Sequence, residues 1–309
     1  MMFFLEATIA GLLAGVMYSL VALGFVLIFK ASGVFNFAQG VMALFAALTL
    51  VGLLQGTVPF VHTNNPDWAL PAWLAIIITI LVMILLAVLI ERLILRHLVN
   101  QEHIILFMAT LGLAYVLEGA GDLIWGSDVK VLDLGLPQGA NDWLLDNYDL
   151  YVEKIEMVAA VTAVLLVTVL AIFFHKTRIG RALRAVADDH QAALSVGISL
   201  RTIWVIVWSV SGIVALVAGV MWGAKSGIQF SLSLIALKAL PVLMLGGFTS
   251  IPGAIIGGLI IGVGEKWAEI YAGPYIGGAI ENWFAYMLAL IFLLFRPQGL
   301  FGEKIIERV

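Results

Sequence analysis

The sequence contains no cysteine and little charge. Only 12% of its 309 residues are charged and 62% are hydrophobic, whereas soluble domains carry about 25% charged residues. The absence of cysteine excludes disulfides and thiol chemistry. The shortage of charge leaves too few polar side chains to cover a water-exposed surface, so we expect an integral membrane protein. Lipid permits only helix bundles and closed barrels.

Several motifs of enzymes are also missing. The chain has no G-x-x-x-x-G-K-[ST] stretch to hold nucleotide phosphates, no H-E-x-x-H and no G-x-S-x-G. It has no pair of aspartate-rich motifs of the kind that a membrane prenyltransferase needs to hold magnesium, and its 5 histidines are scattered. We therefore predict no catalytic residue, no metal site, no cofactor held by this chain and no nucleic-acid partner. A membrane-embedded enzyme would need a polar catalytic constellation, which the sequence does not offer.

Long uninterrupted apolar runs predict helices rather than alternating strands. A membrane span needs about 20 apolar residues. Nine stretches qualify, and their glycine-rich interruptions leave eight or ten spans as alternatives. They are residues 7–29, 34–54, 70–90, 104–125, 157–174 and 203–224, two spans between 231 and 264 joined by a tight turn near Thr249, and 276–295. The expected fold is an all-α polytopic transmembrane helix bundle. Its first span is retained, because MMFFLEA lacks the basic region of a signal peptide.

Charge is distributed unevenly between the predicted loops. Residues 127–156 carry seven acidic side chains against two lysines, while basic side chains gather around Arg92 and Arg96 and along residues 176–201. Loops rich in lysine and arginine stay on the cytoplasmic side. We therefore predict one transmembrane domain, 1–309, with an acidic external loop at 126–156, a cytoplasmic segment at 175–202 and a cytoplasmic C-terminus. Nine spans put the N-terminus outside, and ten put it inside. The acidic loop is either a solvated cap or a landing surface for an external partner.

Six charged residues lie in or next to predicted spans: Glu118, Asp122, Lys238, Glu265, Lys266 and Glu269. Charge inside the membrane marks ion-coupled transport sites. Each of these residues lies within about two or three turns of a predicted membrane interface, and no predicted span has an acidic residue at its midpoint. The pattern favours snorkelling or interhelical pairing. It leaves an ion-coupled secondary carrier or channel as an alternative function.

Two glycine-rich segments, residues 33–40 and 245–254, interrupt the apolar runs. Glycine lets the backbone leave the helix, and the freed amides and carbonyls can face a transport pathway. Transporters often carry such breaks at corresponding positions of two repeats, so the pair also indicates an internal repeat. The predicted pathway-lining residues are Asn36, Phe37, Gln39, Gly40, Gly246, Gly247 and Thr249. The alternative is close helix packing, which the pairs Gly11/Gly15, Gly253/Gly257 and Gly258/Gly262 favour.

The longest polar segment on the basic side, residues 177–199, predicts a short helix, a turn and a second short helix outside the bilayer. It combines three arginines, two aspartates and small residues at helical spacing. Small side chains permit close docking into a partner's groove, and the flanking charges give register and steering. We interpret this segment as a docking surface for a force-generating partner protein. A solvated face held against anionic lipid is the alternative.

Four stretches give the chain a specific resemblance to a known family. GVFNFAQG follows the first span, RIGRALRAVADDHQAALSVGIS lies in the polar segment, LGGFTSIPGAIIGG precedes GVGE, and RPQGLFG follows the last span. In this combination the sequence resembles the permease subunits of branched-chain amino acid ABC importers over essentially its whole length. The first of the two paired permeases of these importers is the closer match.

The resemblance implies both partners and coupling residues. It implies an assembly in a bacterial inner membrane with a homologous second permease subunit, two cytoplasmic ATPase subunits that bind ATP and magnesium, and a periplasmic substrate-binding protein. The family's coupling positions fall on Arg181, Arg184, Ala185, Asp188, Asp189 and Gly197. The implied function is ATP-driven import of branched-chain amino acids or related small neutral or zwitterionic solutes.

Two departures from the family pattern concern the solute. The N-F-A-[HQ]-G stretch falls on residues 36–40, where Gln39 stands in place of the histidine that is frequent in the amino-acid members. Met42 and Ala43 are more apolar than the residues that often follow that glycine. Import of urea, short amides or aromatic acids, which the same family also performs, is therefore kept as an alternative.

Overall fold

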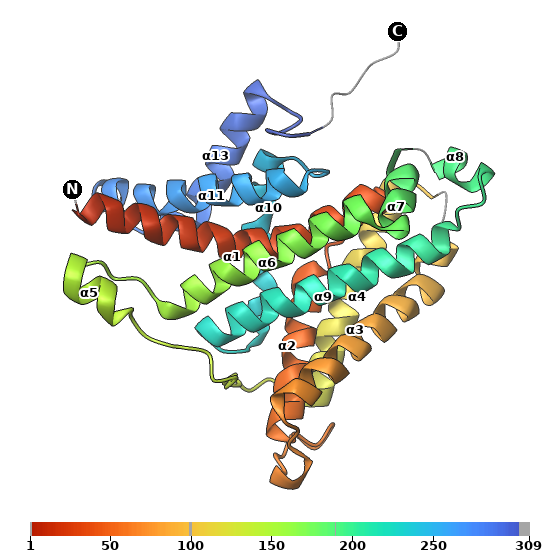
Figure 1. Ribbon diagram of the computed structural model, residues 1–309, viewed down its shortest axis with the longest axis horizontal. Coiled ribbons are helices and arrows are strands. Elements are labelled where there is room, and N and C mark those ends of the chain that lie inside the picture. The colour runs from red at the N-terminus through yellow and green to blue at the C-terminus, as the bar shows by residue number, and fades with distance from the viewer. Residues whose placement is uncertain (1, 99–100, 189, 303–309) are drawn as a thin grey trace. The chain divides into compact units, whose positions relative to one another are not determined.

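The computed structural model describes residues 2–98, 101–188 and 190–302. Within these residues the chain is built from helices (Figure 1), with three isolated backbone bridges and no β-strand. The predicted all-α fold is confirmed. In chain order the elements are α1 (Met2–Ser32), α2 (Gln39–Gln55), η1 (Pro66–Trp68), α3 (Ala72–Leu93), η2 (Leu95–His97), α4 (His103–Trp125), α5 (Asp142–Tyr148), α6 (Lys154–Lys176), α7 (Arg178–Asp188), α8 (His190–Ser195), α9 (Leu200–Ser226), η3 (Phe230–Leu234), α10 (Ile235–Gly246), α11 (Ile251–Trp267), the π-helical η4 (Ala268–Ala272), α12 (Gly273–Ile276) and α13 (Glu281–Phe295).

Six helical segments in the described part of the chain are long and apolar enough to cross a membrane: Phe3–Ser32, Ala72–His97, Ile104–Trp125, Lys154–Lys176, Leu200–Ser226 and Ile251–Ile276. Three shorter apolar helices, Gln39–Gln55, Phe230–Gly246 and Trp283–Phe295, accompany them. Together they coincide with the nine predicted stretches, and the turn predicted near Thr249 separates α10 from α11. The last helix begins later than predicted, at Glu281, because Gly277, Gly278 and Ala279 all have positive φ and interrupt the helix.

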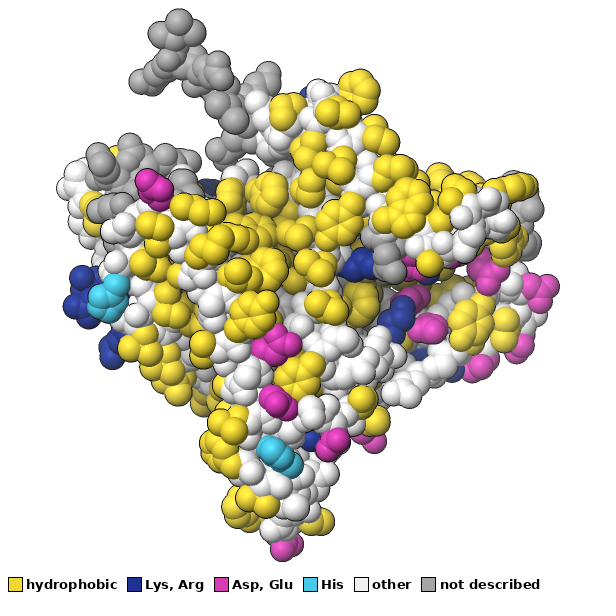
Figure 2. Space-filling model, turned by 180° about the vertical axis from the view of Figure 1, so that it is seen from behind, with side chains coloured by type: hydrophobic (Ala, Val, Ile, Leu, Met, Phe, Trp, Pro, Cys, Tyr) yellow, Lys and Arg dark blue, Asp and Glu magenta, His cyan; other side chains and the backbone are white. Residues whose placement is uncertain are grey.

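One face of α3 consists of exposed apolar side chains. Trp73, Ile77, Leu81, Leu85 and Leu89 recur every four residues and are between 43% and 65% exposed. Hydrophobic side chains also cover much of the face shown in Figure 2. Apolar surface on this scale is unfavourable in water, whereas it matches the hydrocarbon of a bilayer. The protein is therefore a multi-pass membrane protein.

The helices form two compact units. The first unit contains α1 up to Val26, then α5, α6 up to Val167, and α10 to α13. The second unit contains the end of α1, α2 to α4, the end of α6, α7 to α9 and η3. Two helices, α1 and α6, are therefore shared between the units.

The core of the second unit is α2. Its residues from Gln39 to Gly52 are buried on every side, against α3, α4 and α9. A helix that is hydrophobic all round belongs in the interior. Glycine permits the closest approach: a methyl group at Gly219 of α9 would collide with the carbonyl oxygen of Ala43.

The core of the first unit depends on glycine contacts between α1 and α11. A methyl group at Gly15 would collide with the carbonyl oxygen of Gly258, and one at Gly262 would collide with that of Gly11. The Ser19 hydroxyl, which lies 2.8 Å from the Gly15 carbonyl oxygen, is also 3.2 Å from that of Ala254. The packing interpretation of the paired glycines is confirmed, because backbones this close leave no room for a side chain.

Candidate functional site

The polar segment contains the two short helices that were predicted, α7 and α8. Thr177 caps α7, since its hydroxyl oxygen accepts a 2.9 Å hydrogen bond from the Gly180 N–H and its hydroxyl donates to the Phe173 carbonyl at 2.6 Å. A methyl group at Gly180 would collide with the carbonyl oxygens of Phe173 and Phe174. The glycine therefore permits a tight corner between α6 and α7.

One face of α7 is anchored in the second unit. Leu183 and Val186 are buried, and α7 packs against α8 and α9. Leu183 and Ala187 also line a narrow groove with Lys30 at the end of α1. The helix is thus attached to the ends of several membrane-crossing helices.

The opposite face of α7 carries three of the predicted coupling residues. Arg181 is exposed, and Arg184 and Ala185 are half-buried. These three positions are neighbours on a helix surface, because they are three and four residues apart. The Arg184 guanidinium lies 3.2 Å from the Nδ1 atom of His175 at the end of α6. The structure therefore brings them together on one accessible face.

The other predicted coupling residues lie farther along the segment. Asp188 is the last residue of α7, and Asp189 lies outside the described residues. Gly197 follows α8 with φ 83°, and its N–H bonds to the Leu194 carbonyl at 3.0 Å. A left-handed glycine of this kind terminates a helix without strain. It directs the chain from α8 into α9.

The predicted pathway residues near Asn36 form a buried polar junction in the second unit. The Asn36 and Gln39 side chains are 0% and 1% exposed. Asn36 Nδ2 donates to Gln39 Oε1 at 3.2 Å, and the same oxygen accepts a 2.9 Å hydrogen bond from Ser211 of α9. The two amides therefore face interior partners in this conformation. Ser211 has no sequence signal beyond being a serine in an apolar helix.

Thr110 ties the same loop to α4. Its hydroxyl oxygen accepts a 3.1 Å hydrogen bond from the Phe37 N–H and lies 3.1 Å from the Phe35 carbonyl oxygen. The half-buried Phe37 ring meets Phe107 edge to face, with ring centroids 5.9 Å apart. Gly40 is buried one residue into α2. Contacts from α2, α4 and α9 thus hold this loop in place.

The second glycine-rich segment packs against the residues that follow the last helix. Gly246 ends α10 in close contact with Gly253, and Gly247 has φ 101°. The Leu300 N–H bonds to the Leu245 carbonyl at 2.8 Å. A methyl group at Gly299 would lie 2.7 Å from the Gly247 nitrogen. Close backbone packing accounts for both glycines of the turn, and Thr249 beside them is half-buried.

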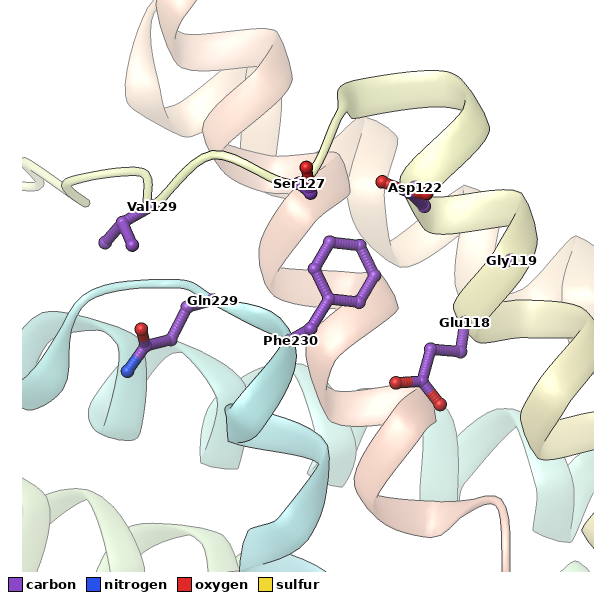
Figure 3. Close-up of a pocket in the computed structure, with 7 residues that line it drawn as sticks. All are labelled: Glu118, Gly119, Asp122, Ser127, Val129, Gln229 and Phe230. Atoms are coloured by element: carbon purple, nitrogen blue, oxygen red, sulfur yellow. The ribbon is translucent and has the colours of Figure 1, made fainter.

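A pocket of about 440 Å³ lies between α4 and the start of η3 in the second unit. Figure 3 shows the Phe230 ring directed toward α4, where Glu118 and Asp122 lie one turn apart. Neither carboxylate makes a hydrogen bond or ion pair with any part of the chain that the structure describes. The pocket therefore has a negative lining that is open to an external group.

An ion pair lies in the predicted acidic loop. Lys154 Nζ lies 2.9 Å from Oδ2 of Asp142, the first residue of α5. The hydrogen bond and the charge of Lys154 lower the pKa of the Asp142 carboxyl. Asp142 is 80% exposed, and exposed pairs contribute little to stability. The pair joins the first residues of α5 and α6.

The first unit contains a buried charge that corrects an expectation from the sequence. Glu265 is 1% exposed and lies near the middle of Ile251–Ile276, a segment of 26 residues. It accepts a 2.8 Å hydrogen bond from the Tyr18 hydroxyl and pairs with Lys238 at 3.3 Å. The predicted span ended at Gly264, whereas the observed segment continues past Glu265 to Ile276. Interhelical pairing, one of the two explanations predicted, is confirmed for Glu265, because Lys238 belongs to α10.

Glu269 contacts backbone N–H groups. Its carboxylate accepts hydrogen bonds of 3.1, 2.7 and 3.0 Å from the N–H groups of Ala279, Ile280 and Glu281. These donors would otherwise be unsatisfied at the start of α13. Glu269 thus connects the end of the α11 segment to the beginning of α13.

Comparisons with known proteins cover nearly the whole chain. The family model described as branched-chain amino acid transport system / permease component matches residues 7–296. The high-affinity branched-chain amino acid transport system permease protein LivH of Salmonella typhimurium is 28% identical over 323 residues, covering 100% of this chain and 98% of the relative. Its counterpart BraD of Pseudomonas aeruginosa is 29% identical over 314 residues, with coverages of 99% and 98%. The probable branched-chain amino acid transport permease protein LivH of Methanocaldococcus jannaschii is 27% identical over 295 residues, with coverages of 92% and 88%.

Proposed function

The chain belongs to the family of branched-chain amino acid transport system permease components, and from this premise we propose that it is the membrane-spanning permease subunit of an ATP-driven importer. Its solutes are branched-chain amino acids or related small neutral or zwitterionic compounds. The relatives that match over the full length are named as permeases of such systems. The chain itself supplies the route, and ATP hydrolysis takes place in separate subunits.

The attachment of α7 is the observation that best supports this proposal. Its buried residues, Leu183 and Val186, fasten the helix to the second unit, while Arg181 remains exposed. The corner at Gly180 leaves no space between α7 and the end of α6. Interiors this densely packed transmit displacement rather than absorb it. A partner that moves α7 therefore also moves α6 and α9.

The proposed cycle follows from this connection. Two cytoplasmic ATPase subunits bind ATP and magnesium, close, and displace α7 and α8. The displacement shifts the membrane-crossing helices and opens the route alternately to each side. A homologous second permease subunit forms the other wall of the route, and a periplasmic binding protein delivers the solute to the external side. In this arrangement residues 126–156 lie outside in a bacterial inner membrane, and the C-terminus lies in the cytoplasm.

The first experiment is a pull-down of the tagged chain from native membranes, with identification of the bound proteins. We expect a P-loop ATPase pair and a second permease, and we expect the ATPase to be lost when Arg181 and Asp188 are replaced together. Recovery of the chain alone or as a homo-oligomer, in a detergent that preserves known ABC complexes, would contradict the proposal. Uptake by this chain alone, driven by an ion or solute gradient, would then identify a carrier or channel.

A further inference from the structure

Four charged side chains from three helices form a cluster with no net charge in the first unit. They are Lys238 of α10, Glu265 and Lys266 of α11, and Glu281 of α13, together called the four-charge cluster. The Lys238–Glu265 and Lys266–Glu281 pairs each have a nitrogen–oxygen distance of 3.3 Å. The Lys238 ammonium also donates to the backbone carbonyl of Glu281 at 3.2 Å. Positive and negative groups therefore lie next to each other along the cluster.

The four-charge cluster is partly open, although Glu265 and Lys266 lie within Ile251–Ile276, a segment long enough to cross a membrane. Glu265 is buried, but the side chains of Lys238, Lys266 and Glu281 are 22%, 31% and 32% exposed. Charged residues within spans face water, a polar ligand or other protein groups, and they do not face lipid. The exposed side of this cluster therefore borders an aqueous route or another polar surface.

The hydrogen bonds of the Lys238 ammonium are long. It has two acceptors among the described residues, at 3.3 and 3.2 Å, and the Tyr18 ring centroid lies 5.7 Å from Nζ. Contacts between an ammonium and a carboxylate are typically about 2.7–2.9 Å long. A carboxylate that arrives from the exposed side can thus form a shorter bond than those already present.

We propose that the four-charge cluster receives the charged groups of a zwitterionic solute as it passes through the permease. This inference rests on the proposed function and adds a solute-contacting site to it. The solute carboxylate binds Lys238 and Lys266, and its ammonium binds Glu281. Glu265 is a positioning residue that holds Lys238, and Tyr18 fixes Glu265 through its 2.8 Å hydrogen bond.

Electroneutrality makes this site selective for a zwitterion. The carboxylate of a zwitterion can take the place of a glutamate beside the lysines, and its ammonium can take the place of a lysine beside Glu281. Every charged side chain of the cluster then keeps a partner of opposite charge. A solute with a single charge would leave one partly buried partner uncompensated, which is unfavourable. The mixed signs of the cluster therefore match an amino acid better than an amine or a carboxylic acid.

The test is uptake of radiolabelled L-leucine by cells that express the complete assembly, with the double substitution Lys238→Met/Glu265→Met. Apolar side chains often replace a buried ion pair without loss of stability, so we expect the complex to assemble. We expect its maximal uptake rate to fall roughly thirtyfold, with no change in the half-saturating leucine concentration, which the binding protein sets. Lys238→Arg keeps the charge and should retain more of the rate.

The control is Trp267→Phe, which removes the 3.1 Å hydrogen bond from Trp267 to Thr8 between α11 and α1 and should keep the wild-type uptake rate.

A wild-type uptake rate in the assembled double variant would assign the cluster to helix packing and overturn the inference. If the double variant does not assemble, the inference is tested with Lys266→Gln. The Lys266 side chain is partly exposed and its replacement leaves the Lys238–Glu265 pair in place, so the assembly should form and uptake must still be slower. Absence of leucine uptake by the wild-type assembly contradicts the assignment of branched-chain amino acids in the proposed function as well, whereas leucine uptake that is insensitive to these changes overturns only the inference.

Discussion

The Ser211 hydroxyl in α9 donates a 2.9 Å hydrogen bond to the side-chain carbonyl oxygen of Gln39, the first residue of α2. The same oxygen accepts from Asn36, and the Gln39 amide nitrogen lies 3.4 Å from the Ser211 carbonyl. The predicted pathway residue Gln39 therefore has interior partners for both ends of its amide. A solute can contact this amide only in a conformation that breaks one of these bonds, so the junction connects solute access to the relative position of α2 and α9.

Ser211→Ala should destabilise the protein by about 1–3 kcal/mol, because it removes a hydrogen bond from a buried amide. The measurement is thermal unfolding of the purified protein in detergent. The matched control is Ser209→Ala two residues earlier, where the half-buried hydroxyl has one hydrogen-bond partner among the described residues, the Val205 carbonyl of its own helix, at 2.7 Å. That change should stay within about 0.5 kcal/mol. Equal effects of the two substitutions would mean that the junction contributes nothing to stability.

Gly258→Ala should separate α1 from α11. The added methyl group would lie 2.6 Å from the Gly15 carbonyl oxygen and would collide with the Ser19 hydroxyl, so we expect a loss of about 1–3 kcal/mol from overpacking. The matched control is Gly112→Ala in α4, where, apart from the adjoining residues and backbone of α4 itself, no atom of the described residues lies within 4 Å of the added group. There the change should be neutral or stabilise the helix by up to about 1 kcal/mol. Unfolding curves in which both variants behave alike would contradict the glycine-mediated contact.

The positions of the helices could be predicted because their determinants are local. Apolar runs long enough to span lipid coincide with the observed helices, and the break between α10 and α11 occurs where glycine and proline interrupt the run. Gly247 adopts φ 101° there, and Pro252 occupies the first turn of α11, where proline needs no hydrogen-bond donor. The two short helices of the polar segment were predictable for the same reason.

Partners distant in sequence could not be predicted. Ser211 reaches a residue 172 positions away, and Thr110 reaches one 75 positions away; neither belongs to a recognisable motif. Glu265 was expected near a membrane interface because the apolar run ends at Gly264. The helix continues past it, since Tyr18 and Lys238 compensate the carboxylate. The local sequence shows that a charged residue is present, but it does not show that residues on other helices compensate the charge.

Arg181→Glu should uncouple transport. Reversing the charge of this exposed residue disturbs the proposed docking face without touching the buried side of α7, so the amount of protein in the membrane should stay normal. We expect uptake to fall by roughly tenfold or more, which corresponds to a loss of about 1.4 kcal/mol, together with a fall in solute-stimulated ATPase activity. Both are measured in vesicles that contain the whole assembly. Arg96→Glu makes the same change on an exposed residue of η2 and should leave both rates near wild type, whereas an equal loss there would indicate a general charge effect.

The absence of cysteine makes the orientation of the chain directly measurable, because a single introduced cysteine has no background. Asn147→Cys places a thiol in α5, at an exposed position of the acidic loop, and His190→Cys places one at the start of α8. A membrane-impermeant maleimide applied to spheroplasts should label the first variant and should label the second only after permeabilisation, because basic loops remain on the cytoplasmic side. The labelling of both variants after permeabilisation shows that each thiol is reactive. The reverse pattern would place α7 and α8 outside the cell, where no ATPase could reach Arg181, and the docking proposal would fail together with the predicted topology.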